Sequence, residues 1–417
     1  MDNLIYWIWL SLACTPDTST FPKLIEKFCD AKRIYDADIK SISRVIGNSA
    51  SDRTALADKE LEKATEVYEF CKKHSIGIVT YGDDEYPNSL RDIQTPPVLL
   101  YYRGSLPDFN IGVYIASVGT RSLSEYGRRS AFKISYDLAS AGATVVSGMA
   151  VGIDGVSHAG ALAAGASTLA VIGSGIDICY PSGHLQLARA IVKCGCVLTE
   201  FAPGTPPSRY NFPKRNRIIS GLCAATIVVE GSERSGSMIT ARFAKKQGRA
   251  VYALPGNVGQ KNSEASNLLI KNGARLVSCA EDIIEHFAES HRGALNPFKL
   301  KPRCPVDMMA ALREYGVQAV CPGDGIFIPP RSERKAKESE VKILDTHVCE
   351  VTSEPPSSFD AKALKLYKKI PTAGECTLES LIDSEFSLRD IMKYLLKLEM
   401  GHFIVMLPGE KVARKSK

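Results

Sequence analysis

The chain has 417 residues, with 52 Lys and Arg against 46 Asp and Glu, so its formal net charge is +6. Hydrophobic residues make up 45% of the chain and charged residues 24%. These values are near the averages for globular proteins and exclude a wholly disordered, a collagen-like or a membrane-dominated chain. A chain of this length predicts two to four domains. The mild positive charge permits nucleic-acid binding but does not by itself indicate it.

Helical patterns dominate the N-terminal part of the chain. The apolar run Leu4–Cys14 has no basic residue before it and is too short to cross a bilayer, so we interpret it as a buried helix rather than a signal peptide or an anchor. A longer helix is predicted over Asp58–Lys73. We therefore expect a small helical domain over residues 1–75, in a cytoplasmic protein that has no membrane partner.

The twelve cysteines are scattered along the chain and form no CxxC pair. Zinc sites and disulfide frameworks usually show cysteines at short, regular spacings such as CxxC. The pattern therefore predicts reduced thiols in a cytosolic protein, with neither a metal site nor disulfides.

Short apolar strands alternate with helices from about Ile111 onward. This alternation is typical of βαβ units, so it predicts an α/β fold with a doubly wound, mostly parallel sheet. A further strand is expected over Val98–Tyr102, among turns. We assign residues 76–288 to one Rossmann-like domain, with its core at 111–288. The expected core strands are Val113–Val118, Thr144–Ser147, Thr168–Ile172, Cys196–Glu200, Thr226–Glu230, Ala250–Ala253 and Arg275–Val277.

The last third of the chain changes in composition twice. Residues 289–360 include a charge-rich run and a Pro-Pro-Ser-Ser stretch, which is the composition of a linker or insert. In residues 361–417 the apolar periodicity predicts three helices followed by a hairpin. Three helices and a hairpin predict a winged-helix domain.

The loops that follow the predicted strands carry most of the Gly, Ser and Arg residues of the region. Ligands of open parallel sheets bind outside the carboxyl ends of the strands, and glycines and helix N-termini suit a phosphate. With Arg121 in the first of these loops, the pattern favours an anionic ligand. Neither GxGxxG nor GxxxxGK[ST] is present, which argues against a nicotinamide cofactor and a P-loop nucleotide.

The segment Arg209–Arg217 reads RYNFPKRNR and lies in what we interpret as a long loop over residues 201–217. It holds four basic residues, two aromatic residues and no acid. Basic groups that follow a backbone, with aromatic faces that stack on bases, suit single-stranded nucleic acid. The alternative is a solvated basic turn in which Arg217 pairs with a carboxylate such as Glu200 or Glu230.

Two pairs of titratable residues are open to a catalytic and a structural interpretation. Asp154 and His158 lie four residues apart near a predicted helix start; we favour a structural pair over an acid–base pair. Glu200 and Glu230 end predicted strands at the ligand edge. We favour their pairing with the arginines of the basic segment over a catalytic role.

Several motifs, in order along the chain, resemble those of the DprA/Smf family, the DNA-processing proteins of bacterial natural transformation. The resemblance covers about residues 1–288 and, more weakly, 361–412. It departs from the family pattern at Ala265, Ser157 and His184. The motifs are YPNSL at 86–90, PVLLY at 97–101, SGMAVGIDGVSH at 147–158, GSGIDICYP at 173–181, FPKRNRIISG at 212–221 and SGSMITA at 235–241.

This resemblance implies a protein that binds single-stranded DNA in a basic pocket, forms a homodimer and loads the RecA recombinase. It implies a sterile-alpha-motif-like helical domain, no enzymatic activity, no catalytic residue, no metal and no cofactor. The implied DNA-binding residues are Gly119, Thr120, Arg121, Arg209, Phe212, Lys214, Arg215, Arg217, Ser235, Gly236, Ser237 and Lys245. The residues expected to shape the ligand edge are Ser147, Gly148, Gly152, Asp154, His158, Gly173, Gly175, Pro255 and Gly256.

Two other classes of protein stay open. One is a Rossmann-like nucleotide phosphoribohydrolase of the lysine-decarboxylase-like type; its PGGxGTxxE signature is not completed after Pro255–Gly256, which counts against it. The other is a transcription regulator that reads duplex DNA with a winged helix.

Overall fold

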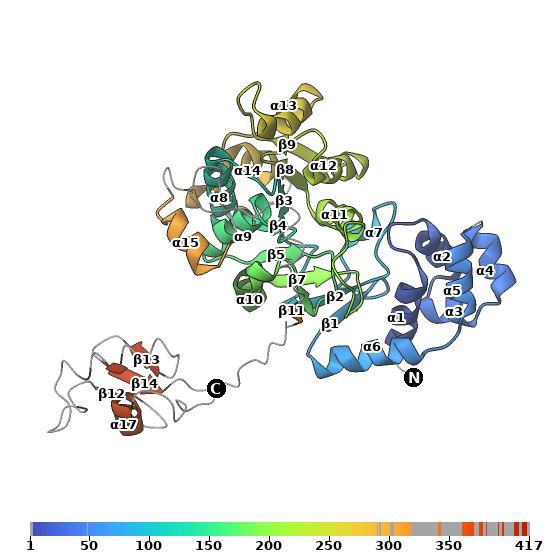
Figure 1. Ribbon diagram of the computed structural model, residues 1–417, viewed down its shortest axis with the longest axis horizontal. Helices are drawn as coiled ribbons and strands as arrows, with labels where there is room; N and C mark the ends of the chain where they lie inside the picture. The colour runs from blue at the N-terminus through green and yellow to red at the C-terminus, as the bar shows by residue number, and fades with distance from the viewer. Residues whose placement is uncertain are drawn as a thin grey trace. The chain divides into compact units, whose positions relative to one another are not determined.

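A computed structural model describes two compact units, 1–344 and 345–417 (Figure 1). The residues it describes are 3–47, 49–289, 291, 293–300, 304–317, 341–342, 361–370, 375–377, 381, 391, 394–395, 404–407 and 411–414.

The first unit begins with six short helices, as the N-terminal pattern predicts. The first of them contacts the third, fifth and sixth. Trp7, Ile8 and Leu10 of this first helix are almost completely buried, so the apolar run forms the core of the bundle. The helices are α1 (Asn3–Ala13), α2 (Thr20–Phe28), α3 (Ala31–Asp36), α4 (Ile39–Ile46), α5 (Ala50–Ala57) and α6 (Glu62–Lys73).

A nine-stranded, mostly parallel sheet follows, in the order β1-β2-β7-β5-β4-β3-β8-β9-β10. β2 pairs antiparallel with β1 and β7, and the other pairs of this sheet are parallel. The short strands β6 and β11 pair separately and antiparallel. The strands are β1 (Gly77–Thr80), β2 (Leu99–Gly104), β3 (Tyr114–Val118), β4 (Thr144–Ser147), β5 (Thr168–Val171), β6 (Ile178–Cys179), β7 (Cys196–Thr199), β8 (Ala225–Val228), β9 (Ala250–Ala253), β10 (Arg275–Leu276) and β11 (Val341–Lys342).

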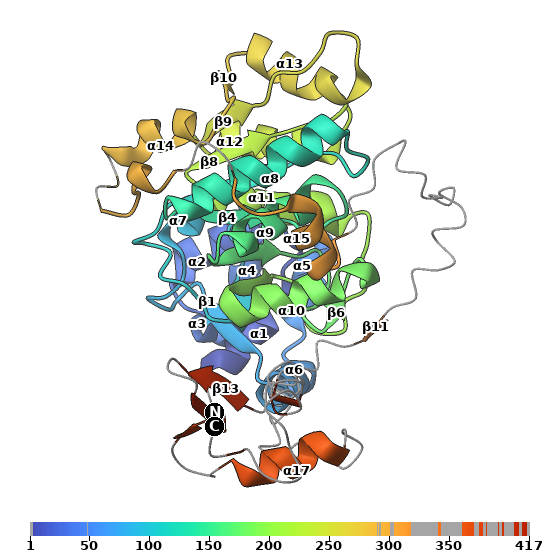
Figure 2. The ribbon, with the colours of Figure 1, turned by 90° about the vertical axis from the view of Figure 1, so that its left-hand side faces the viewer.

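Helices cover both faces of this sheet, so the α/β prediction is confirmed. The main helices are α7 (Asn88–Arg91), α8 (Glu125–Ser140), α9 (Ile153–Ala163), α10 (Leu185–Cys194), α11 (Asn211–Leu222), α12 (Gly236–Lys246), α13 (Glu264–Lys271), α14 (Glu281–Ala288) and α15 (Met308–Glu314); single 3₁₀ turns lie at Ser182–His184, Lys261–Ser263 and Pro297–Lys299. Figure 1 shows α8 and α9 on one side of the strands and α11 and α12 on the other. Figure 2 turns the side with α8, α10 and α15 toward the viewer.

Alternating strand residues explain the two covered faces. Ile115 and Ile227 belong to the core cluster that contains α8, α9 and α14. Ala116 and Val228, one residue further along, belong to the cluster that contains α11 and α12. Because successive side chains of a strand point to opposite faces, apolar residues at every position bury both faces, as parallel sheets require.

The C-terminal unit is described in pieces. They are α17 (Ala361–Lys369), β12 (Glu375–Thr377), β13 (Ile404–Leu407) and β14 (Lys411–Arg414). The strands form one antiparallel sheet in the order β12-β14-β13, and Leu366, Ile370, Ile391 and Leu395 are buried. Much of the expected second and third helices lies outside the described residues, as does most of the 289–360 linker, so the winged-helix assignment stays a prediction.

Candidate nucleic-acid interface

The strand order places β3 between β4 and β8, so the direction of strand addition reverses at the β3–β8 pair. A crevice for ligands forms at such a switch point in open α/β sheets. The loops after β3 and β8 hold Gly119–Arg121 and Gly231–Ser237. The Thr120 N–H donates to the Glu230 carbonyl at 2.8 Å, and the Ile153 N–H donates to the Thr120 carbonyl at 3.2 Å. The loops after β3, β4 and β8 therefore meet at one edge.

An aromatic side chain from α11 lies at this edge. The Phe212 ring has the Arg121 guanidinium 5.4 Å from its centroid and the Tyr180 ring 5.5 Å away, tilted by 33°. A Cβ at Gly173 would lie 2.9 Å from the Phe212 ring, so the glycine makes room for the aromatic group. Phe212 remains partly exposed and Arg121 is exposed. The structure thus brings together Arg121, Tyr180 and Phe212 from three separate segments of the chain. The sequence pointed to a role for Arg121 and Phe212 but not for Tyr180.

The structure corrects our loop interpretation of residues 201–217, because α11 begins at Asn211. Pro213 is compatible with the first turn of a helix, where its missing N–H has no intrahelical partner to lose. The exposed Arg209 lies just before the helix; its guanidinium stacks on Tyr210 at 4.8 Å and donates to the Tyr210 hydroxyl at 2.6 Å. Lys214 is partly exposed. These basic side chains remain accessible to an anion.

The N-terminus of α12 faces the same edge. The hydroxyls of Ser235 and Ser237 lie 2.7 Å apart, and neither caps a backbone N–H of the helix start with its side chain. Nothing lies within 4 Å of the position that a Cβ would take at Gly236. Unsatisfied N–H groups at a helix start attract phosphates. Lys245 lies ten residues along this helix, about 15 Å from its start, so the structure does not bring it to the edge.

Arg215 is buried rather than exposed. Its guanidinium donates to the carbonyls of Gly148, at 2.9 Å, and Val171. A Cβ at Gly148 would lie 2.5 Å from this guanidinium, so the glycine is required for the contact. Burial lowers the pKa of Arg215 to about 10, opposed by the charge of Asp154. In this arrangement Arg215 orders the loop after β4 instead of facing solvent.

Arg217 is also buried, and its partner is one that the sequence analysis named. Its Nη2 lies 2.6 Å from Oε2 of Glu200, and the two side chains are 1% and 5% exposed. Burial raises the pKa of Glu200, and the positive charge of Arg217 opposes that rise. The expected pairing of Glu200 with an arginine is therefore present.

Glu230 does not pair with an arginine, so that part of our expectation is wrong. Its carboxylate accepts from the Ser124 N–H at 2.9 Å and from the Ser124 hydroxyl, and Asn262 Nδ2 lies 3.5 Å away. Asn262 Nδ2 also donates to the Ser122 carbonyl at 2.9 Å. The buried carboxylate consequently holds the loop that carries Arg121. Arg215 and Arg217 have other partners, which are the Gly148 and Val171 carbonyls and Glu200.

Asp154 and His158 are both buried, and each has a partner of its own. Asp154 accepts from the Gly148 N–H at 3.2 Å; burial raises its pKa, opposed by Arg215. His158 Nδ1 lies 2.8 Å from the Thr168 hydroxyl, which itself donates to the Val145 carbonyl at 2.7 Å. That hydroxyl must accept, so we assign the proton to Nδ1. Burial lowers the pKa of His158 to about 3.

The remaining edge residues also engage the protein. The Ser147 hydroxyl donates to the Ser117 carbonyl at 2.6 Å, and Gly152 caps α9. The Gly175 N–H donates to the Thr205 carbonyl at 2.8 Å. Gly256 exchanges two hydrogen bonds with the Asn267 amide, and the Pro255 carbonyl accepts from the Tyr126 hydroxyl. These contacts hold the loops that frame the edge.

Among the residues that the structure describes, no cluster of three or more His, Cys, Asp or Glu side chains is arranged to hold a metal ion. No helix among those residues has the length and apolar character needed to span a bilayer. The nine cysteines from Cys14 to Cys304 are free thiols.

The fold and the edge define a class: a doubly wound α/β protein with cationic and aromatic groups at its switch point. The sequence model described as DNA recombination-mediator protein A matches residues 77–288. The chain belongs to this family of DNA-processing proteins.

Individual relatives agree with the family assignment. The chain is 42% identical over 219 residues to the DNA processing protein DprA of Streptococcus pneumoniae, covering 52% of this chain and 76% of that protein. It is 38% identical over 227 residues to the Bacillus subtilis DprA, covering 54% and 76%. The X-ray structure of DNA processing protein A from S. pneumoniae superposes with a TM-score of 0.60 at 32% identity, covering 68% of this chain and 98% of that one.

Proposed function

We propose that this chain binds single-stranded DNA along the carboxyl edge of its sheet. The observation that carries the proposal is the partly exposed Phe212 ring held between Arg121 and Tyr180. An aromatic face beside an exposed cation can stack a base while the cation meets the neighbouring phosphate. Duplex DNA hides its base faces inside the helix, so this combination favours single strands.

Phosphates would bind at the same edge as that ring. The backbone of Gly119–Arg121 and the start of α12 at Ser235–Ser237, where Ser235 makes no side-chain cap, are the groups that would hold them. Arg209 and Lys214 would extend the cationic track along the strand. Arg215 and Arg217 are buried with protein partners, so in this proposal they order the edge and do not contact DNA.

The biological role that we propose follows from membership of the family. The chain would act in the cytoplasm as a homodimer that protects incoming single strands during natural transformation and loads RecA onto them. It would do so as a mediator and not as an enzyme. We further propose a helical domain at 1–75, the strand-binding domain at 76–288, a linker at 289–360 and a winged helix at 361–417.

Fluorescence anisotropy of a labelled polythymidine strand and a matched duplex, over a salt series, tests the binding. We expect tighter binding of the single strand, with a logarithmic salt slope of about −0.7 per phosphate neutralised. Arg121→Ala should weaken binding and flatten the slope. Phe212→Ala should weaken binding with little change in slope, since stacking releases few counterions. Lys72→Ala, on α6, removes the same charge outside the edge and serves as the control.

Equal affinity for strand and duplex, with no effect of either edge variant, would rule out this binding mode. A positive result leads to the second assay, in which RecA filament formation is followed on a strand coated with single-strand-binding protein. The chain should accelerate filament formation, and Phe212→Ala should accelerate it less. Filament formation at the unassisted rate would limit the function to binding and protection.

A further inference from the structure

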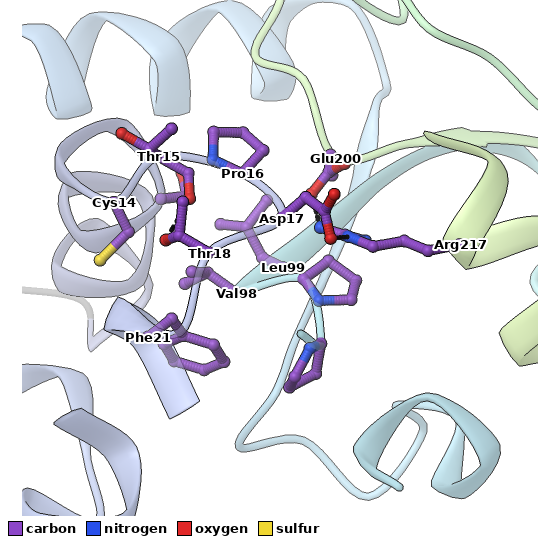
Figure 3. Close-up of a pocket in the computed structure, with 13 residues that line it drawn as sticks. Cys14, Thr15, Pro16, Asp17, Thr18, Phe21, Val98, Leu99, Glu200 and Arg217 are labelled. Atoms are coloured by element: carbon purple, nitrogen blue, oxygen red, sulfur yellow. Dashed lines mark hydrogen bonds and ion pairs between the residues drawn. The ribbon is translucent and has the colours of Figure 1, made fainter. Parts of the chain in front are cut away.

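A small cavity lies where the helical bundle meets the sheet (Figure 3). Its volume is about 20 Å³, and it is lined by the α1–α2 loop, by the Pro96–Leu99 segment, and by Glu200 and Arg217. Figure 3 shows Asp17 of the α1–α2 loop and Glu200 pointing toward the Arg217 side chain from two different segments. The basic segment of the candidate interface therefore reaches the helical bundle at this point.

Two carboxylates share the one guanidinium. Arg217 Nη2 lies 2.6 Å from Glu200 Oε2, and Arg217 Nε lies 3.3 Å from Asp17 Oδ1. The same Asp17 oxygen accepts from the Thr95 hydroxyl at 2.8 Å. Within the described residues neither Nε nor Nη1 of Arg217 makes a hydrogen bond, so the Asp17 contact is an ion pair without a hydrogen bond. The position of this buried side chain thus depends on the two carboxylates.

The two ion pairs connect distant parts of the chain to helix α11. Asp17 follows α1, with a left-handed φ of 61°; Thr95 precedes β2, and Glu200 follows β7. A charge that leaves water is costly unless it is paired and hydrogen-bonded. Arg217 consequently has little freedom to move away from these partners, and α11 cannot shift along the sheet without separating them.

The N-terminal end of α11 carries the proposed base-stacking ring, and Arg217 lies near the middle of the helix. Phe212 precedes Arg217 by five residues, about 7.5 Å along a rigid helix. Its partly exposed ring lies against Arg121, Tyr180 and Gly173, as described above. Contacts of this kind are sensitive to displacements of a few tenths of an ångström. A change at Arg217 is therefore transmitted to the ring.

We propose that Asp17 and Glu200 are positioning residues for strand binding, which hold Arg217 and through α11 set the place of Phe212. The helical bundle thereby contributes to affinity for single strands although its Asp17 does not touch DNA. This inference rests on the proposed function. It assigns to the α1–α2 loop a role that neither the family motifs nor the switch-point geometry contains.

Asp17→Asn in the full-length chain tests the inference. Its side chain is 26% exposed, so the change keeps the shape and removes the charge without burying a new one. We expect polythymidine affinity to fall about 3- to 10-fold, a size usual for coupled neighbours, with an unchanged salt slope because no phosphate contact is lost. Asp38→Ala removes the N-cap of α4 and is the matched control: it should lower bundle stability without lowering affinity.

The double variant with Phe212→Ala separates positioning from general destabilisation. If Asp17 acts through the ring, Asp17→Asn should cost less than twofold once the ring is absent. An equal loss in both backgrounds, or a loss also caused by Asp38→Ala, would overturn the inference. Should Asp17→Asn not fold, Thr95→Val removes only the hydrogen bond to Asp17 and should lower affinity about twofold in the same ring-dependent way.

The two proposals fail differently. If the wild type binds single strands, Arg121→Ala weakens that binding and Asp17→Asn does not, then the positioning role is wrong and the proposed function stands. If the wild type binds single strands no better than duplex, both are wrong.

Discussion

The two halves of the basic segment at 209–217 have the same chemistry and opposite surroundings. Arg209 and Lys214 keep solvent-accessible charges, whereas Arg215 and Arg217 are buried against carbonyls and carboxylates. The difference arises because α11 begins within the segment and turns its later residues toward the sheet. A run of positive charges therefore indicates a ligand surface only where its side chains are exposed. Where they are buried, the charges bind other parts of the protein and hold the loops of that surface in place.

Among substitutions in the basic segment, the largest loss of stability is expected at the buried Arg215. Arg215→Ala leaves the buried carbonyls of Gly148 and Val171 without their donor and removes a positive charge near the buried Asp154. Hydrogen bonds to a charged group contribute about 1.5–3 kcal/mol each, so the loss should be about 3–5 kcal/mol. We expect urea denaturation to show a loss of that size in the free energy of unfolding. Arg215→Ala combined with Asp154→Ala should lose less than the two single variants added together. Full stability of Arg215→Ala with weakened strand binding would instead make Arg215 a direct contact.

Removal of the carboxylate that holds the Arg121 loop should have the next largest effect. Glu230→Ala leaves the Ser124 N–H without its acceptor, and we expect a loss of about 2–3 kcal/mol in the free energy of unfolding. The affinity for single-stranded DNA should fall too, because the loop that carries Arg121 is no longer held in place. Glu233→Ala, an exposed neighbour in the following loop, is the control. If both variants behave alike, the Glu230 contacts contribute nothing specific.

Acid should lower the free energy of unfolding through the buried side chain of His158. Its pKa is about 3 in the folded protein and about 6.5 in the unfolded chain. The unfolded state therefore takes up a proton first as the pH falls below 6.5, so stability is lost between pH 6.5 and 3. For this residue the loss is about 2 kcal/mol at pH 5.

Unfolding free energies of the wild type and His158→Asn between pH 7 and pH 5 would measure that contribution. The variant should lack this share of the pH dependence, although His184, whose pKa burial also lowers, keeps its own. Identical pH profiles of the two proteins would place the acid sensitivity elsewhere.

The exposed half should show the smallest effect on stability. Arg209→Ala should change the free energy of unfolding by less than about 0.5 kcal/mol, as surface substitutions do. Its effect should appear in binding: an affinity loss of about 1 kcal/mol and a salt slope flatter by about 0.7, the signature of one lost phosphate contact. A stability loss like that of Arg215→Ala would remove the distinction between the halves.

Local sequence patterns predicted eight of the nine strands of the sheet to within a few residues, because β-branched runs between turns leave few alternatives, and missed β1 at Gly77–Thr80. They also predicted the pairing of Glu200 with an arginine, since both lie at the same edge. The start of α11 at Asn211 was missed, because Pro213 and the flanking polar residues also suit a loop. The ion pair between Asp17 and Arg217 could not be predicted from the sequence. It forms because the helical bundle docks against the sheet, and local periodicity carries no information about that docking.

The position of β3 has a consequence for how the molecule is made. Its partner β4 follows closely, but its other partner, β8, pairs Thr226 with Ala116, more than a hundred residues later. A ribosome that adds about 5–20 residues per second delivers β8 seconds after β3, and long-range pairing of this kind is slow to form. The edge that we propose for DNA is thus completed late, and a nascent chain would present β3 with one side unpaired until β8 arrives.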